Sequence, residues 1–204
     1  MATRKTTSRR TAGSVCNAFS VPDVKFPVQL PKPRQTEPQE CLALITATSA
    51  DAVRIKLIPD ELAVRKILDE TYGNGGWCKR QYFADSQLWC AVGVYCPATG
   101  EYVYKDAAAF SLPCRDPAQM RKTTSLLAAA AIWGVGQDVL ELGNILLKSE
   151  QVPIITDDES SERKRYRLGT SLTVDRFARN ESGRITMVQF AMNDGRKVLW
   201  QEET

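Results

Sequence analysis

Residues 77–110 read WCKRQYFADSQLWCAVGVYCPATGEYVYKDAAAF, and this stretch decides the fold. It contains three runs with the composition of β-strands, at 77–83, 88–95 and 102–110. Turn-forming residues connect the runs closely, which predicts antiparallel pairing, because a parallel pair needs a much longer crossover. Apolar residues occupy both faces of the middle run, so we expect other elements to cover both sides of this meander.

Helices on either side of this stretch supply the expected cover. Residues 60–72 carry apolar side chains at helical spacing, and residues 116–133 form a longer, alanine-rich helix that can approach a sheet closely. A further helical stretch is expected at 138–148. Alternating runs in the tail predict strands at 171–177, 184–191 and 197–200. The predicted fold class is α+β, with a three-stranded antiparallel β-meander packed by a long helix (a β-β-β-α core) and a C-terminal β-hairpin or meander.

Composition divides the chain into four parts. We expect a basic, proline-containing flexible arm at 1–44, a folded core at 45–150, a charged hinge at 151–168 and the C-terminal β-meander at 169–204. Residues 1–36 hold seven basic residues and one acid, whereas the whole chain has a net charge of +3. Such an arm suggests a polyanionic partner, although basic tails are often only solubilising. The first twenty residues also have the composition of an organelle transit peptide, and we favour the arm over that alternative.

The cysteines and the missing histidine exclude several classes of site. The chain has six cysteines, none in a Cys-x-x-Cys pair, and no histidine, so the spacing of a structural zinc site is absent and no metal or other cofactor is expected. We interpret the cysteines as reduced thiols of a cytoplasmic protein. The longest apolar run, 126–135, is about half of what a bilayer span needs, so no membrane association is expected.

No catalytic centre is evident, and we expect that the protein is not an enzyme. Without histidine, neither a Ser-His-Asp nor a Cys-His arrangement can form. The glycine-rich segment 73–76 lacks the Gly-Lys-Ser/Thr of a phosphate loop and precedes a strand, so we interpret it as a turn. The acids Asp157, Asp158, Glu159 and Glu162 are interspersed with basic residues, which is more typical of a solvated loop than of a cation site.

Binding to single-stranded nucleic acid is better supported, since it requires cations for phosphates and flat rings for bases. The candidate contact residues are the basic side chains of the meander and of the long helix: Lys79, Arg80, Lys105, Arg115, Arg121 and Lys122. The helix residues are equally well explained as the solvent side of an amphipathic helix. Stacking is open to Trp89, Tyr95, Tyr102 and Tyr104, although aromatic residues in central strands are more often part of the core.

The order of these elements resembles the Rad-fifty-two family of single-strand annealing proteins, in particular its phage and prophage members. The resemblance covers roughly residues 45–148 and is carried by the segments LDETYGNGGW (68–77), GEYVYKD (100–106) and IWGVG (132–136). The tail segments SGRI (182–185) and NDGRKV (193–198) also resemble a hairpin that ends some prophage members. The resemblance implies assembly into rings or helical filaments and ATP-independent annealing of complementary single strands in recombination or repair. Family members bind the strand in a basic groove lined by the hairpin and the long helix.

The resemblance also implies partners, and the sequence departs from the family pattern in its basic residues. The implied partners are single-stranded DNA, further copies of the chain, and a host or phage single-strand binding protein or exonuclease, in a bacterium or phage-infected host. Family members commonly carry a Lys-Arg pair midway along the long helix, where this chain has Leu127 and Ala128, and an arginine where it has Gln137. The nearby cations or the basic arm are the candidate replacements. Two alternatives stay open: a single-strand binding module without annealing activity, and a partner-binding protein that kept the fold.

Overall fold

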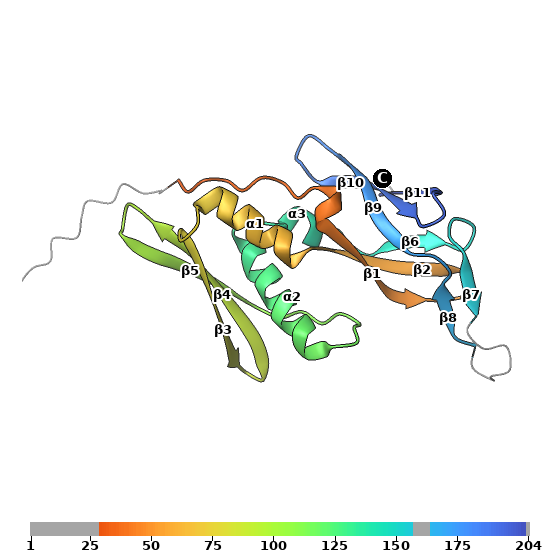
Figure 1. The fold of residues 1–204 in the computed structure, drawn as a ribbon, viewed down its shortest axis with the longest axis horizontal. Coiled ribbons are helices and arrows are strands. Elements are labelled where there is room, and N and C mark those ends of the chain that lie inside the picture. The colour runs from red at the N-terminus through yellow and green to blue at the C-terminus, as the bar shows by residue number, and fades with distance from the viewer. Residues whose placement is uncertain (1–28, 157–163, 203–204) are drawn as a thin grey trace, which may run out of the picture.

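The computed structural model describes residues 29–156 and 164–202, which form the α+β fold shown in Figure 1. The elements group into two lobes, each with its own apolar cluster. One lobe contains α1 (Glu61–Tyr72), β3 (Trp77–Ala84), β4 (Gln87–Cys96), β5 (Glu101–Ala108) and α2 (Pro117–Ile132). The other contains β1 (Cys41–Thr48), β2 (Ala52–Pro59), β6 (Ile145–Lys148), β9 (Leu172–Arg179), β10 (Ile185–Met192) and β11 (Lys197–Gln201).

The predicted meander forms as an antiparallel sheet in the order β3-β4-β5. Its central strand buries alternate side chains, among them Cys90, Val92 and Val94, against α2 and α1. The long helix begins at Asp116, whose side chain accepts hydrogen bonds from the backbone amides of Ala118 and Gln119, both at 3.0 Å. This meander-and-helix core is the β-β-β-α arrangement expected from the sequence.

A second sheet, in the order β1-β2-β6, was not predicted. The helical stretch expected at 138–148 is wrong: only a short helix, α3 (Gln137–Leu140), forms there, and the chain then enters β6. The physical reason is visible in the burial pattern, because Ile145 and Leu147 are buried while Leu146 and Lys148 are exposed. This alternation fits a strand that presents one face to a core.

The tail forms the predicted C-terminal meander in the order β11-β10-β9. One of its faces packs on the β1-β2-β6 sheet, and Phe190, Ile185 and Val188 are completely buried there. The sheet β1-β2-β6 therefore has one face in this core, while its other face is directed toward α2 and the segment that precedes it.

The described part of the predicted arm lies along the body (Figure 1). Arg34 contacts Glu40 at 2.7 Å and Glu70 of α1 at 2.8 Å, and a short 3-10 helix (Pro38–Glu40) leads into β1. The predicted boundary after residue 44 thus falls inside β1. The predicted hinge contains a two-stranded ribbon of β7 (Ile154–Thr156) and β8 (Tyr166–Leu168), while residues 1–28 and the four candidate acids at 157–162 lie outside the described residues.

Among the described helices, none is long and apolar enough to cross a membrane.

Candidate nucleic-acid interface

The predicted basic residues of the meander lie on opposite faces of it. Lys79 and Lys105 both pair with Val92, and directly paired residues share a face, so these two lysines lie on the face that carries the helices. Arg80 pairs with Ala91 and lies on the opposite face, which we call the outer face. The six candidates therefore do not form one continuous track.

Interactions within the protein engage both inner lysines. The Nζ atom of Lys105 lies 4.2 Å from the ring centroid of Trp133 and donates a hydrogen bond of 3.2 Å to the carbonyl of Ile132. Lys79 keeps 29% of its side-chain surface exposed and lies 3.9 Å from a carboxylate oxygen of Glu61. Both charges are therefore partly compensated within the protein.

Glu61 connects the two helices to the meander. Its carboxylate accepts hydrogen bonds from Arg65 at 2.6 Å and from Thr123 of α2 at 2.6 Å. Burial alone would raise the pKa of Glu61, but these hydrogen bonds and the nearby charges of Arg65 and Lys79 outweigh it and lower the pKa. The carboxylate stays ionised and holds Lys79 in place.

The three remaining candidates lie on and just before the first half of α2. Arg115, Arg121 and Lys122 are exposed, and within residues 29–156 and 164–202 their side chains make no ion pair or hydrogen bond. The helix is fixed to β3 beside them, because Gln81 donates to the carbonyl of Lys122 at 2.8 Å and to the hydroxyl of Ser125 at 3.0 Å. The backbone that carries Arg121 and Lys122 is therefore held in place, and the three basic side chains are open to a ligand.

A groove between the β1-β2-β6 sheet and the segment before α2 adds further cations. This groove, which we call the basic groove, has a volume of about 420 Å³ and is lined by Thr46, Arg54, Lys56, residues 110–113, Gly143 and Asn144. Arg54 is exposed and has no ion pair in the described part of the chain. Lys56 donates to the carbonyls of Leu140 and Leu142, and burial lowers its pKa.

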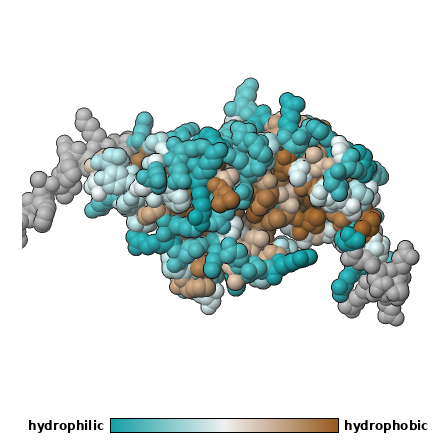
Figure 2. Space-filling model, in the orientation of Figure 1, coloured by the Kyte–Doolittle hydropathy of each residue, from teal (hydrophilic) through white to brown (hydrophobic). Residues whose placement is uncertain are grey.

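A second cavity on the same sheet is mainly apolar. This neighbouring cavity of about 350 Å³ is lined mainly by apolar residues, including Leu42, Leu44, Ile58 and Met120, with Asp60, Glu61 and Asp116 at its rim. Figure 2 shows the corresponding apolar area over β1 and β2. Arg54 and Lys56 therefore line the basic groove and not this cavity.

Arg54 and Lys56 were not among the predicted site residues, because the strand that carries them was not predicted. The signal was present in the sequence: Val53, Ile55 and Leu57 are completely buried and alternate with the two basic residues. A period of two residues is the signature of a half-buried strand. The basic residues of such a strand necessarily share its outward face.

The outer face of the meander has no cover within the described residues, contrary to the expectation that both faces are covered. Tyr95, Tyr102 and Tyr104 retain 41%, 38% and 39% of their surface, and Trp89 is half-buried. The interpretation of these aromatic residues as core is therefore wrong for the three tyrosines. Arg80 lies among them, with its guanidinium carbon 4.4 Å from the ring centroid of Tyr104.

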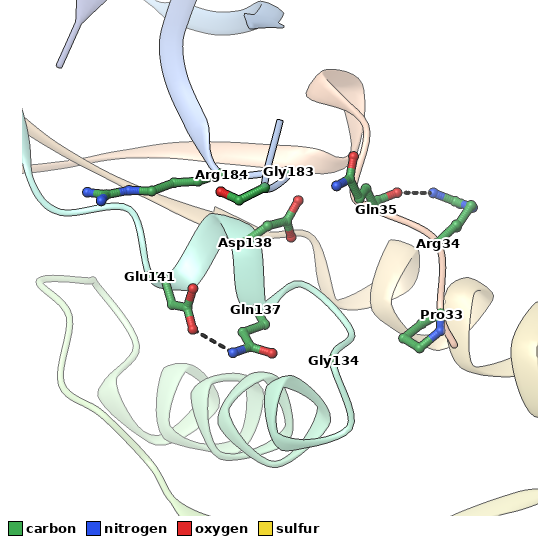
Figure 3. A pocket seen from close by; sticks show the side chains of 10 residues that line it. Pro33, Arg34, Gln35, Gly134, Gln137, Asp138, Glu141, Gly183 and Arg184 are labelled. Carbon is green, nitrogen blue, oxygen red and sulfur yellow. Dashed lines mark hydrogen bonds between the residues drawn. The ribbon is translucent and has the colours of Figure 1, made fainter. Parts of the chain in front are cut away.

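The positions that depart from the family pattern have structural roles. Leu127 is completely buried in the core of its lobe. Gln137 lines a polar pocket of about 350 Å³ between residues 33–35, the turn before α3 and the β9–β10 turn (Figure 3). It donates a hydrogen bond of 2.5 Å to Glu141 there, and the neighbouring Asp138 contacts Arg179 at 2.7 Å. The charges around this pocket are mostly paired within the protein.

The described residues form no metal site and no disulfide. In the described ranges, no group of three or more acids or cysteines could hold a metal ion. Five cysteines are described, and all are free thiols: Cys41, Cys78, Cys90, Cys96 and Cys114. Burial raises the pKa of Cys41 to about 12 and that of Cys90 to about 11. Neither buried thiol is ionised near neutral pH.

Comparison with known proteins gave no relative. No family model matches the sequence, and no similar curated protein or solved structure was found.

Proposed function

We propose that this protein binds single-stranded DNA and promotes ATP-independent annealing of complementary strands, as the resemblance to the Rad-fifty-two family implies. The observation that carries the proposal is the cluster of uncompensated cations around the basic groove and the start of α2. Arg54, Arg115, Arg121 and Lys122 are exposed and have no anionic partner in the described chain, while the half-buried Lys56 lines the same groove and donates to two carbonyls. Such charges bind phosphates by releasing condensed counterions.

Binding of this kind favours annealing without a nucleotide cofactor. Cations that hold the backbone reduce the repulsion between two polyanionic strands and raise their local concentration, so complementary segments meet more often. Phosphate contacts carry no sequence information, which suits a protein that must accept any strand. In this proposal, several copies of the chain place their grooves side by side in a ring or filament and no covalent step is involved.

A second function is favoured by one specific observation. Leu127 is buried, Ala128 is apolar and Gln137 bonds to Glu141, so the three positions at which the family carries cations offer none here. A protein that kept the fold but binds a protein partner would show the same loss. The two functions differ in whether the purified protein accelerates pairing of complementary strands.

The experiment that tests the proposal measures binding and annealing with labelled oligonucleotides. We expect the wild type to bind single strands with an affinity that falls with salt, and to accelerate pairing of complementary strands. Arg121→Ala combined with Lys122→Ala should reduce the slope of log K against log salt by about 1.4, at about 0.7 for each lost contact with a single strand.

A matched control separates this site from a general effect of charge. Arg176 of β9 and Lys164 are exposed and belong to the C-terminal part of the chain, so replacing both by alanine removes the same charge elsewhere. The control should keep the wild-type slope. Equal losses in both double variants, or a wild type that binds no single strand, would overturn the proposal.

A further inference from the structure

The outer face of the meander presents a row of aromatic rings. The ring centroids of Tyr95 and Tyr102 are 5.5 Å apart with an interplanar angle of 63°, and those of Tyr102 and Tyr104 are 6.3 Å apart with an angle of 36°. We call these three rings together with Arg80 the tyrosine platform. The platform lies on the opposite face of the meander from Lys79 and Lys105, because its residues point to the other side of the same strands.

The rings are held in place from below. Gly93 lies directly under Tyr104, and a Cβ atom at this glycine would lie 2.5 Å from the ring. The hydroxyl of Tyr102 donates a 2.6 Å hydrogen bond to the carbonyl of Gly75, and that of Tyr104 lies 3.3 Å from the sulfur of Cys78. Because its hydroxyl is engaged, Tyr102 offers mainly its ring to a partner, whereas the ring of Tyr104 has Gly93 on one side and the guanidinium of Arg80 over it.

The charge on the platform favours an anionic partner. The guanidinium of Arg80 lies over the ring of Tyr104, 4.4 Å from its centroid, and makes no ion pair with a described residue. The acid on the same face, Asp106, accepts a 2.5 Å hydrogen bond from Tyr82, which partly compensates its charge. An exposed guanidinium beside ring faces suits a partner that combines flat groups with phosphates.

We propose that the tyrosine platform stacks the bases of an unpaired nucleic-acid strand. The rings are tilted by 63° and 36° relative to their neighbours, so bases that lie on successive rings cannot stay parallel and stacked on one another as they do in a duplex. The platform therefore selects single strands and accepts any base, since every base has a π-face. The inference takes its partner from the proposed function but assigns the bases to a surface other than the basic groove.

The test compares two oligonucleotides with the same number of phosphates, one of oligothymidylate and one in which abasic spacers replace the bases. Loss of a stacked base weakens single-strand binding on the order of tenfold. We expect the wild type to bind the thymidylate strand at least about tenfold more tightly than the abasic strand. Tyr102→Leu combined with Tyr104→Leu should lose this preference while keeping the affinity for the abasic strand and its salt dependence.

Control variants keep the outcomes distinct. Tyr102→Phe combined with Tyr104→Phe removes the hydroxyls but retains the rings, so it should keep the preference for bases. A wild type that binds both strands equally well refutes the platform and leaves the proposed function standing, whereas one that binds neither strand refutes the proposed function. If the leucine variant keeps the preference but loses self-association in sedimentation, the face binds a second copy of the chain and the inference is wrong.

Discussion

Replacing Asp138 by asparagine should destabilise the protein through the junction between its N-terminal segment and its tail. The side chains of Arg179 and Asp138 are only 18% and 15% exposed, and the guanidinium lies 2.7 Å from Oδ2 of the carboxylate. That oxygen accepts no hydrogen bond of good geometry, so the interaction is mainly a charge contact. Arg179 also donates to the carbonyl of Thr36 at 2.7 Å and to that of Gly183 at 3.0 Å.

The magnitude follows from how deeply the pair is buried. Removing one partner of a fully buried pair costs about 3–5 kcal/mol, because the other charge is left without compensation. Residual exposure of both side chains and the two carbonyls that still bind Arg179 reduce this cost, so we expect a loss of about 2–3 kcal/mol. For a chain of this size, the loss corresponds to a decrease in Tm of roughly 4–12 °C.

The assay is thermal and urea unfolding of the two aspartate variants. Asp175→Asn is the matched control, because Asp175 pairs at 2.8 Å with Lys197 in a contact whose side chains are 33% and 52% exposed. A pair that exposed contributes about 0–1 kcal/mol. If Asp138→Asn lowers the free energy of unfolding no more than Asp175→Asn does, the argument that the contact between Asp138 and Arg179 joins the two parts is refuted.

Other substitutions test the platform, a buried thiol and the groove. Gly93→Ala should displace the ring of Tyr104 and cost about 1–3 kcal/mol, and it should weaken the preference for base-bearing over abasic strands; an unchanged preference and stability would contradict the close contact. The pKa of Cys41 is raised to about 12 from an ordinary value of 9.0, so the folded thiol stays protonated while the unfolded thiol ionises. Its contribution to stability is therefore complete below pH 9.0 and is lost between there and about pH 12, by about 1.4 kcal/mol per pH unit, and urea titrations of the wild type and Cys41→Ala should converge across this range. Arg54→Ala should reduce the salt slope of single-strand binding by about 0.7 in fluorescence anisotropy, whereas Arg176→Ala should leave it unchanged.

The sequence predicted the elements whose local signals agree with their packing. The meander has turn residues between its strands, and α2 has an N-cap at Asp116. The sequence therefore predicted the bounds of these elements to within a few residues. The prediction of a helix at 138–148 failed because the helix ends at Leu140, a bend follows at residues 141–142, and the apolar residues of β6 alternate as in a strand. Short apolar runs do not distinguish the two states by periodicity alone.

The site was harder to predict than the fold, because it depends on which side of a strand each residue occupies and on what lies opposite. Lys79 and Arg80 are adjacent in the sequence, yet one contacts Glu61 and the other lies on the outer face. The partner of Lys79 is 18 residues away in sequence and belongs to α1. No local pattern indicates that contact.

These placements limit what charge alone can contribute to binding. Glu61 partly compensates Lys79, and Lys105 is held between Trp133 and the end of α2, so on the helix-bearing side of the meander the described cations most open to phosphates are those of the groove and of the start of α2. At about 0.7 per contact, the four exposed cations Arg54, Arg115, Arg121 and Lys122 give a single-strand salt slope of about −2.8. An affinity carried by so few contacts weakens when salt rises, whereas stacking on uncharged ring faces depends little on salt. Because the rings and these cations lie on different surfaces, tight binding at high salt requires the strand to reach the tyrosine platform as well as the basic groove.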